Sequence, residues 1–233
     1  MSGSTSSLFP NNSIASDLFV ANLAGLGATI REIQHAAMAP AFLMPASMRS
    51  SLGIIANTNI NTANASSLNS ATITSSTITL TGGAVTSLAA EGSTNVYLEG
   101  ASSNNAFVIK AGLFAEKGST EYSTVLGNGG YSIVESGGNA SGTDIGSGGA
   151  QFVYSGGTAT GTVINTSGTQ IIASGGTANT IYIDGKGAAE IVQAGGTDSG
   201  AIAILGGIEN VFGLSKNAVI GNNGLLLRNL EVR

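Results

Sequence analysis

A short motif built around a glycine pair recurs four times in the second half of the chain. It reads ESGGNA at 135–140, YSGGTA at 154–159, ASGGTA at 173–178 and QAGGTD at 193–198. The first glycines of the four pairs follow one another after 19, 19 and 20 residues. Three positions before each pair stands an aliphatic residue: Val134, Val153, Ile172 and Val192. A repeat this short cannot bury its own apolar side chains, so the repeats must stack to form a core.

The spacing predicts stacked β-strands separated by glycine corners. Gly118, Gly100 and Gly82 continue the period backwards, so about seven or eight repeats fit between about residue 66 and about residue 220. A period of about 19 residues accommodates two or three short strands, and glycine permits positive φ at the turns between them. The predicted corner glycines are Gly137, Gly138, Gly156, Gly157, Gly175, Gly176, Gly195 and Gly196. We predict an all-β fold, a single-chain parallel β-solenoid of the right-handed β-helix type, with an N-terminal α-helical segment.

The first 50 residues differ from the repeats and predict that helical segment. Apolar residues recur there at alternating gaps of four and three, which is typical of one face of an α-helix: Phe19, Leu23, Leu26, Ile30 and Ile33. We expect the helix to cap or flank the rod, with a helix–helix oligomerisation seam or binding to a membrane surface as less favoured alternatives. The predicted organisation is a polar tail plus amphipathic helix at 1–50, solenoid repeats at 51–224, and an apolar C-terminal strand or contact segment at 225–233.

A second apolar column lies directly beside the aliphatic one in the repeats. Its members are Ile133, Phe152, Ile171 and Ile191. Neighbouring residues of a strand point to opposite faces, so we expect this column to form an apolar ladder on the outside of the rod, unlike an ordinary solvated face. We interpret it as a contact surface for the N-terminal helix or for a neighbouring rod. The alternative is an irregular strand in which both columns are partly buried.

The end of the chain is also apolar. Leu225, Leu227 and Leu230 lie there, and an uncovered strand edge of this kind can pair with another chain. We expect an adhesive end that contacts another copy. The alternative is a segment that folds back as a cap.

Composition and residue counts exclude several functional classes. The chain has 35 glycines, only 9% charged residues and a net charge of −5, so a basic surface for nucleic acid is not expected. Without cysteine there is no disulfide framework and no thiolate ligand or nucleophile. His35 is the one histidine, which leaves no base for a hydrolytic triad near the repeats. The four aspartates are dispersed, and no calcium-binding nonapeptide recurs. We expect no catalytic, cofactor-binding or metal-binding residues.

The repeats resemble a known family. The runs QFVYSGGTA at 151–159 and TQIIASGGTA at 169–178 are similar to the passenger repeats of adhesins involved in diffuse adherence, and the likeness extends over about 129–207. These adhesins are autotransporters, and the resemblance implies a parallel β-helical rod on a bacterial surface, with adhesive, aggregating or biofilm roles and frequent sugar modification of Ser and Thr.

Two features depart from that family. The first residues lack the basic and then apolar pattern of a secretory signal, so we expect no Sec signal, and from the length of 233 residues we expect no C-terminal translocating barrel. On these grounds we slightly favour a cytoplasmic location. A cell-surface or extracellular location reached by a non-Sec route is the alternative.

These observations lead to three ranked functional hypotheses. The first is a non-enzymatic structural protein that self-assembles through the solenoid ends and the apolar ladder into filaments or sheets, as a cytoskeleton-like scaffold does. The second is a bacterial surface adhesin or biofilm matrix protein, and the third is a β-helical polysaccharide-active protein. The expected partner is the protein itself, with cell-surface or polysaccharide components as further candidates and no nucleic acid.

Overall fold

The computed structural model describes residues 72–75 and 77–229, together with the backbone of five earlier strands between Phe42 and Asn69. The predicted helix lies outside these residues, as do the assembly contacts proposed on it and at the C-terminus: Phe19, Leu23, Leu26, Ile30, Ile33 and Leu230. In the part of the chain that is described, no helix is long and apolar enough to cross a bilayer.

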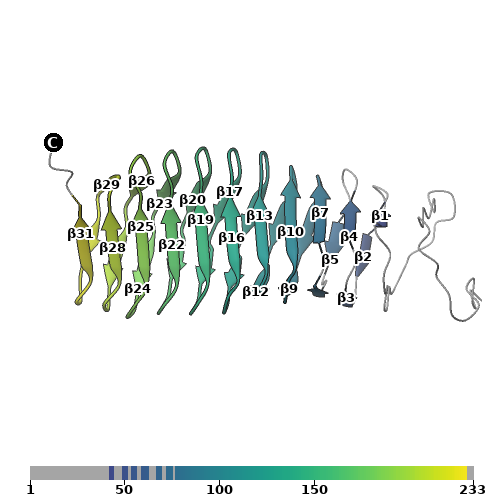
Figure 1. Ribbon diagram of the computed structural model, residues 1–233, viewed down its shortest axis with the longest axis horizontal. Helices are drawn as coiled ribbons and strands as arrows, with labels where there is room; N and C mark the ends of the chain where they lie inside the picture. The colour runs from purple at the N-terminus through teal and green to yellow at the C-terminus, as the bar shows by residue number, and fades with distance from the viewer. Residues whose placement is uncertain are drawn as a thin grey trace, which may run out of the picture.

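Every strand belongs to one of three parallel sheets that run the length of a rod (Figure 1). Sheet A contains eleven strands: β1 (Phe42–Met44), β4 (Asn59–Thr62), β7 (Thr77–Thr81), β10 (Asn95–Glu99), β13 (Gly112–Ala115), β16 (Tyr131–Val134), β19 (Ala150–Val153), β22 (Thr169–Ile172), β25 (Ala189–Val192), β28 (Ile208–Val211) and β31 (Leu225–Arg228).

Sheets B and C contain ten strands each. Sheet B consists of β2 (Arg49–Ser51), β5 (Ser67–Asn69), β8 (Ala84–Thr86), β11 (Ser102–Asn104), β14 (Thr120–Tyr122), β17 (Asn139–Ser141), β20 (Thr158–Thr160), β23 (Thr177–Asn179), β26 (Thr197–Ser199) and β29 (Leu214–Lys216). Sheet C consists of β3 (Ile54–Ala56), β6 (Thr72–Thr74), β9 (Ala89–Glu91), β12 (Phe107–Ile109), β15 (Val125–Leu126), β18 (Asp144–Ile145), β21 (Val163–Ile164), β24 (Tyr182–Asp184), β27 (Ile202–Ile204) and β30 (Val219–Ile220).

The predicted parallel β-solenoid is confirmed. Each coil contributes one strand to each sheet, and β7 and β31 are eight coils apart in sheet A. Strand pairing continues back through β4 to β1, so solenoid strands begin within the segment expected to hold the tail and helix. The predicted boundaries at residues 50 and 224 stay predictions.

The core is built from columns of equivalent residues. In sheet A the fourth strand position is aliphatic in coil after coil, and Val134 pairs with Val153, which pairs with Ile172. These three side chains are fully buried, as is the Ile145, Ile164 and Ile183 column of sheet C. Because parallel strands are aligned, each apolar side chain packs on its counterpart in the next coil, and the rod acquires one continuous core.

The two glycines of each corner serve different purposes. Gly156 has a φ of 77°, and the Gly157 amide donates to the Tyr154 carbonyl at 2.9 Å, which is the arrangement of a β-turn with glycine at its third position. Gly157 lies against the preceding coil, where an added Cβ would stand 2.5 Å from the Val134 carbonyl oxygen. The other three pairs follow the same division: positive φ occurs at Gly137, Gly175 and Gly195, and close approach to a carbonyl occurs at Gly138, Gly176 and Gly196.

This division predicts different costs for the two glycines. Gly157→Ala should destabilise the rod by about 3 kcal/mol, because the Val134 carbonyl that it would strike already accepts the Tyr154 amide at 2.9 Å. Gly156→Ala should cost about 1–2 kcal/mol of left-handed backbone strain, since its nearest neighbour is the rotatable Ser136 hydroxyl. Urea denaturation followed by circular dichroism measures both, with the exposed Ser155→Ala as control. Equal losses in the two alanine variants would contradict this division.

Candidate functional site: the two faces of sheet A

Sheet A carries different chemistry on its two faces. In β16, β19, β22 and β25, the first and third residues face outward and are half-buried, whereas the second and fourth face inward and are fully buried. The outer face presents an apolar ladder, and the inner face adds a polar column beside the aliphatic one. Both run along the rod axis.

The outer ladder consists of the third residues of successive strands. The structure aligns the four predicted members in adjacent strands and leaves them half-buried: Ile133, Phe152, Ile171 and Ile191. Their strand neighbours in the aliphatic column are fully buried, so the two columns do not share the interior.

The ladder is longer than the repeat motif indicated. Tyr97 and Phe114 precede Ile133 in the same column, and their rings stack with centroids 4.5 Å apart. Phe114 also meets Tyr131 edge to face at 5.8 Å. In the other direction the column changes to Asn210 and then Leu227, and Leu225 and Leu227 on β31 are 45% and 43% exposed.

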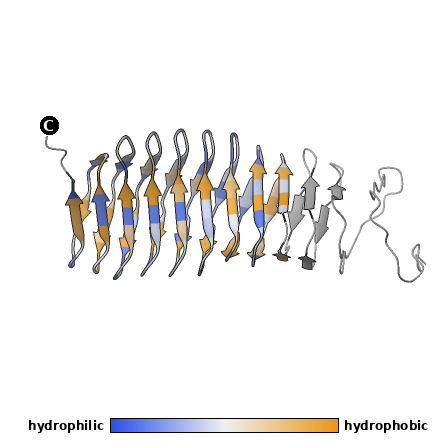
Figure 2. Ribbon diagram, in the orientation of Figure 1, coloured by the Kyte–Doolittle hydropathy of each residue, from blue (hydrophilic) through white to orange (hydrophobic). Residues whose placement is uncertain are grey.

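The inner polar column consists of the second residues of the same strands: Ser132, Gln151, Gln170, Glu190 and Glu209. All five are fully buried. Strands β19 to β28 accordingly carry a hydrophilic band between hydrophobic segments (Figure 2). A polar residue at this depth is costly unless it is hydrogen-bonded, so the partners of each member decide what the column can do.

The first half of the column is bonded to itself and to sheet B. Ser132 donates to Glu121, a buried residue of β14. Gln151 Nε2 donates to Thr143 Oγ1 at 3.0 Å, and Gln170 Nε2 donates to Gln151 Oε1 at 2.7 Å. Burial raises the pKa of Glu121 to about 7, against hydrogen bonds from neighbouring side chains that lower it. This segment is a structural hydrogen-bond network that contains one proton-binding carboxyl.

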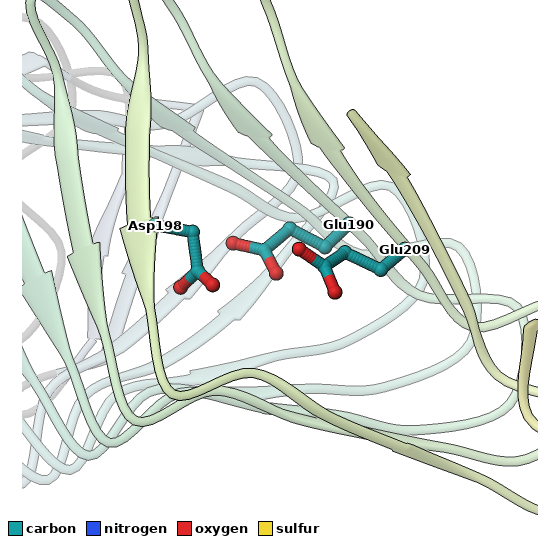
Figure 3. A group of neighbouring side chains, drawn as sticks. All are labelled: Glu190, Asp198 and Glu209. Carbon is teal, nitrogen blue, oxygen red and sulfur yellow. The ribbon is translucent and has the colours of Figure 1, made fainter. Parts of the chain in front are cut away.

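The second half of the column gathers carboxylates instead. Glu190 and Glu209 meet Asp198 of β26, and Figure 3 shows the three side chains converging in the interior. We call these three residues the acidic trio. Carboxylate oxygens of the trio lie within 4.8 Å of one another, each residue is fully buried, and none of the six oxygens has a hydrogen-bond partner.

Burial and mutual repulsion favour the protonated forms of the trio. Burial raises the pKa of Glu190, and the charges of Asp198 and Glu209 raise it further. Burial and the charge of Glu209 raise the pKa of Asp198 to about 7, against interactions with the backbone of Ala201 and Ser199 that lower it. Burial also raises the pKa of Glu209, while the nearby Ser215 hydroxyl and Arg228 lower it.

The sequence analysis missed this cluster and expected no metal-binding residues. The signal was present, since the alternation that places Val192 inward also places Glu190, two residues earlier, inward. The spacing of Asp144 and Asp184 from the glycine pairs, on which the expectation rested, says nothing about the column beside the aliphatic one. Oxygen ligands in this number are the kind that hard divalent cations take.

The remaining acidic groups do not converge in a cleft. Asp144 is exposed and accepts a hydrogen bond from Asn165 Nδ2. Two coils further along, the residue aligned with Asp144 is Tyr182, so Asp184 lies two residues away from that alignment. Partial burial raises the pKa of Glu116, and the charges of Glu99 and Glu135 on adjacent coils raise it further. Within residues 72–229, no histidine or cysteine lies beside these groups, because His35 lies outside the described residues and the chain has no cysteine.

The fold and the two faces of sheet A define a three-sided parallel β-solenoid. The family described as adhesin of bacterial autotransporter system, probable stalk, matches residues 99–168, less than a third of the chain. This match confirms the resemblance of the repeats to autotransporter adhesins and starts at an earlier coil than the motif had indicated.

The solved structures contain the same fold. The crystal structure of the TibC-catalysed hyper-glycosylated fragment of TibA superposes with a TM-score of 0.59 at 19% identity, over 86% of this chain and 96% of that fragment. At this identity the likeness concerns the fold alone. The comparison with curated proteins found no match.

The Glu121 carboxyl predicts a pH dependence of stability. Its pKa in the folded protein, about 7, lies above the ordinary value of 4.5, so the folded state holds a proton that the unfolded chain releases. The stabilisation is complete below about pH 4.5 and is lost as the pH rises through 7, up to roughly 3 kcal/mol. Glu121→Gln, which keeps the shape and removes the titration, should therefore reduce the loss of unfolding free energy between pH 5 and pH 8.

Urea titrations at the two pH values measure this difference. Ser155→Ala, an exposed substitution without a titrating group, serves as control and should retain the wild-type pH dependence. An unchanged pH dependence in Glu121→Gln would show that this carboxyl does not bind the proton.

Proposed function

We propose that this chain is a non-enzymatic stalk segment of a bacterial surface adhesin, and that it makes contacts with other copies through the outer ladder. The observation that carries the proposal is the unbroken alignment of one repeat, from β7 to β31, in a region that includes the adhesin stalk match. At about 4.8 Å per coil, eight coils extend about 38 Å. A rod of this kind holds whatever it carries at a set distance from its base.

The absence of convergent catalytic groups in the described residues supports a mechanical role. Glu99 and Glu135 are exposed at corners, whereas Glu121 and the acidic trio are enclosed in the interior. A hydrolytic site on a β-helix needs acidic groups that share a solvent-filled cleft with the substrate. The polysaccharide-active hypothesis receives no support from this arrangement.

The outer ladder supports self-contact as the adhesive mode. Half-exposed Phe152, Ile171 and Ile191 form a straight apolar row parallel to the rod, and contiguous apolar surface of this kind marks interaction sites. Two rods that lie side by side would bury their apolar rows against each other. If the two rods are on different cells, this contact joins the cells. The N-terminal helix, the other expected occupant, would compete for the same row.

Self-assembly into filaments is the second candidate function. It is favoured by β31, which pairs with β28 alone among the described strands and exposes Leu225 and Leu227. An end-to-end contact between different surfaces extends without limit unless rotation closes it. Electron microscopy of purified protein at high concentration separates the two modes: end-to-end filaments support this candidate, and paired or bundled short rods support lateral contact.

Location decides between a surface adhesin and an internal scaffold. Intact cells that produce the protein should lose its signal on brief protease treatment, whereas a cytoplasmic reference protein should persist. Protection of the chain until the cells are lysed would contradict the surface proposal and favour an internal scaffold.

Replacing two apolar residues of the outer ladder should weaken the association between copies of the chain. Each apolar side chain buried in a contact contributes about 1.5–3 kcal/mol, so Phe152→Ser with Ile171→Ser should raise the dissociation constant of self-association at least roughly tenfold. Sedimentation velocity of the purified protein and the settling rate of cells measure the effect. Val163→Ser with Tyr182→Ser is the matched control, because these aligned residues lie on the outer face of sheet C. An equal loss in both double variants would contradict a specific role for sheet A.

A further inference from the structure

We propose that the acidic trio is an interior binding site for one calcium ion, ligated by Glu190, Asp198 and Glu209. The site lies inside the solenoid, apart from the outer ladder. The inference is independent of the proposed adhesive function.

Few other groups act on the oxygens of the trio: the backbone of Ala201 and Ser199 lowers the pKa of Asp198, and the Ser215 hydroxyl lowers that of Glu209. All six carboxylate oxygens are buried without a hydrogen bond, and a buried carboxylate in that state is among the most unfavourable groups in a protein. The charge of Arg228 lowers the pKa of Glu209, but by less than burial raises it. The protein therefore either keeps protons on these groups or places a cation among them.

Two further polar groups beside the trio also lack partners. Ser215, aligned with Asp198 in the next coil, is 5% exposed, and its Oγ has no hydrogen-bond partner. Gln170 precedes Glu190 in the inner column and is fully buried, and its Oε1 is unpartnered although its Nε2 donates to Gln151. A hydroxyl and an amide carbonyl are acceptors that calcium binds together with carboxylates.

The inward-facing side chain of sheet C is smaller in the coil that contains Glu190 and Asp198. Sheet C supplies a fully buried Ile to each of three consecutive coils, ending with Ile183. In the next coil, which contains Glu190 and Asp198, the aligned residue is Ala203. The coil that carries two of the carboxylates therefore has the smallest of these four interior side chains of sheet C.

The origin of the ligands suits calcium better than magnesium. Calcium–oxygen distances of about 2.3–2.6 Å place opposite ligands up to about 5 Å apart, which accommodates carboxylate oxygens that lie within 4.8 Å of one another. Magnesium requires near-ideal octahedral geometry and retains several waters. Side chains from β25, β26 and β28 on two different sheets are more easily arranged around the flexible calcium sphere.

Calorimetric titration of the full chain with CaCl2, after treatment with EDTA and dialysis, tests the proposal. We expect one calcium ion per chain, a rise in the melting temperature on calcium addition that EDTA reverses, and a much smaller response to MgCl2. A magnesium response equal to that of calcium would overturn the assignment, as would the absence of calcium binding at pH 7.5.

Two triple variants locate the site. Glu190→Gln, Asp198→Asn and Glu209→Gln together retain the side-chain shapes and should abolish calcium binding and its thermal shift. The matched control, Glu99→Gln, Glu116→Gln and Glu135→Gln together, removes the same charge from the corner column and should bind calcium as wild type does. Calcium binding that survives in the first variant, or is lost in the control, would overturn the proposal.

The interior triple variant must be shown to fold before its loss of calcium binding is interpreted. Circular dichroism in EDTA should show that the interior triple variant retains its β-structure, because it no longer encloses adjacent charges. If that variant does not fold, Asp198→Asn alone replaces it and should weaken calcium binding at least tenfold. Unchanged affinity in Asp198→Asn would contradict ligation by the trio.

Discussion

Alignment of equivalent residues along the rod axis is the constraint on which the rest of the structure depends. Parallel pairing places Val134 beside Val153 and Val153 beside Ile172, so a side chain chosen for one coil must be compatible with its own counterpart in the next. Aliphatic residues meet this condition through packing, and glycine pairs meet it at the corners, where the second glycine lies against the preceding coil. The same condition makes the outer ladder straight.

A buried polar side chain can be followed by the same residue in the next coil only if it both donates and accepts hydrogen bonds. The amide of Gln170 donates to the amide of Gln151, so glutamine can follow glutamine in a buried column. A carboxylate accepts and cannot donate unless it is protonated, so Glu190 and Glu209 cannot satisfy each other in this way. The interior thus changes along the rod from a network of hydrogen-bonded side chains to a group of carboxylates that needs protons or a cation.

Period and alternation were sufficient to predict the solenoid and the outward direction of the ladder. The glycine pairs marked the corners, and the residue before each inward aliphatic necessarily lay outside. The aromatic part of the ladder escaped prediction because Tyr97 and Phe114 lie in coils without the glycine-pair motif. The trio escaped because Asp198 belongs to a different strand from Glu190, and only the folded coil shows that the two side chains point to the same place. Adhesin-like stalk repeats, ranked second from the sequence, are favoured by the family match over the filament hypothesis.

Pairing along the axis also determines how the rod would respond to force. The hydrogen bonds between coils, such as the Gly156 amide to the Gly175 carbonyl at 2.9 Å, join each coil to the next. A pull between the two ends would load these bonds in tension, one interface after another, and not in shear across a whole sheet. Such a rod would lengthen by peeling single coils and would absorb a sudden load in small steps instead of breaking at once.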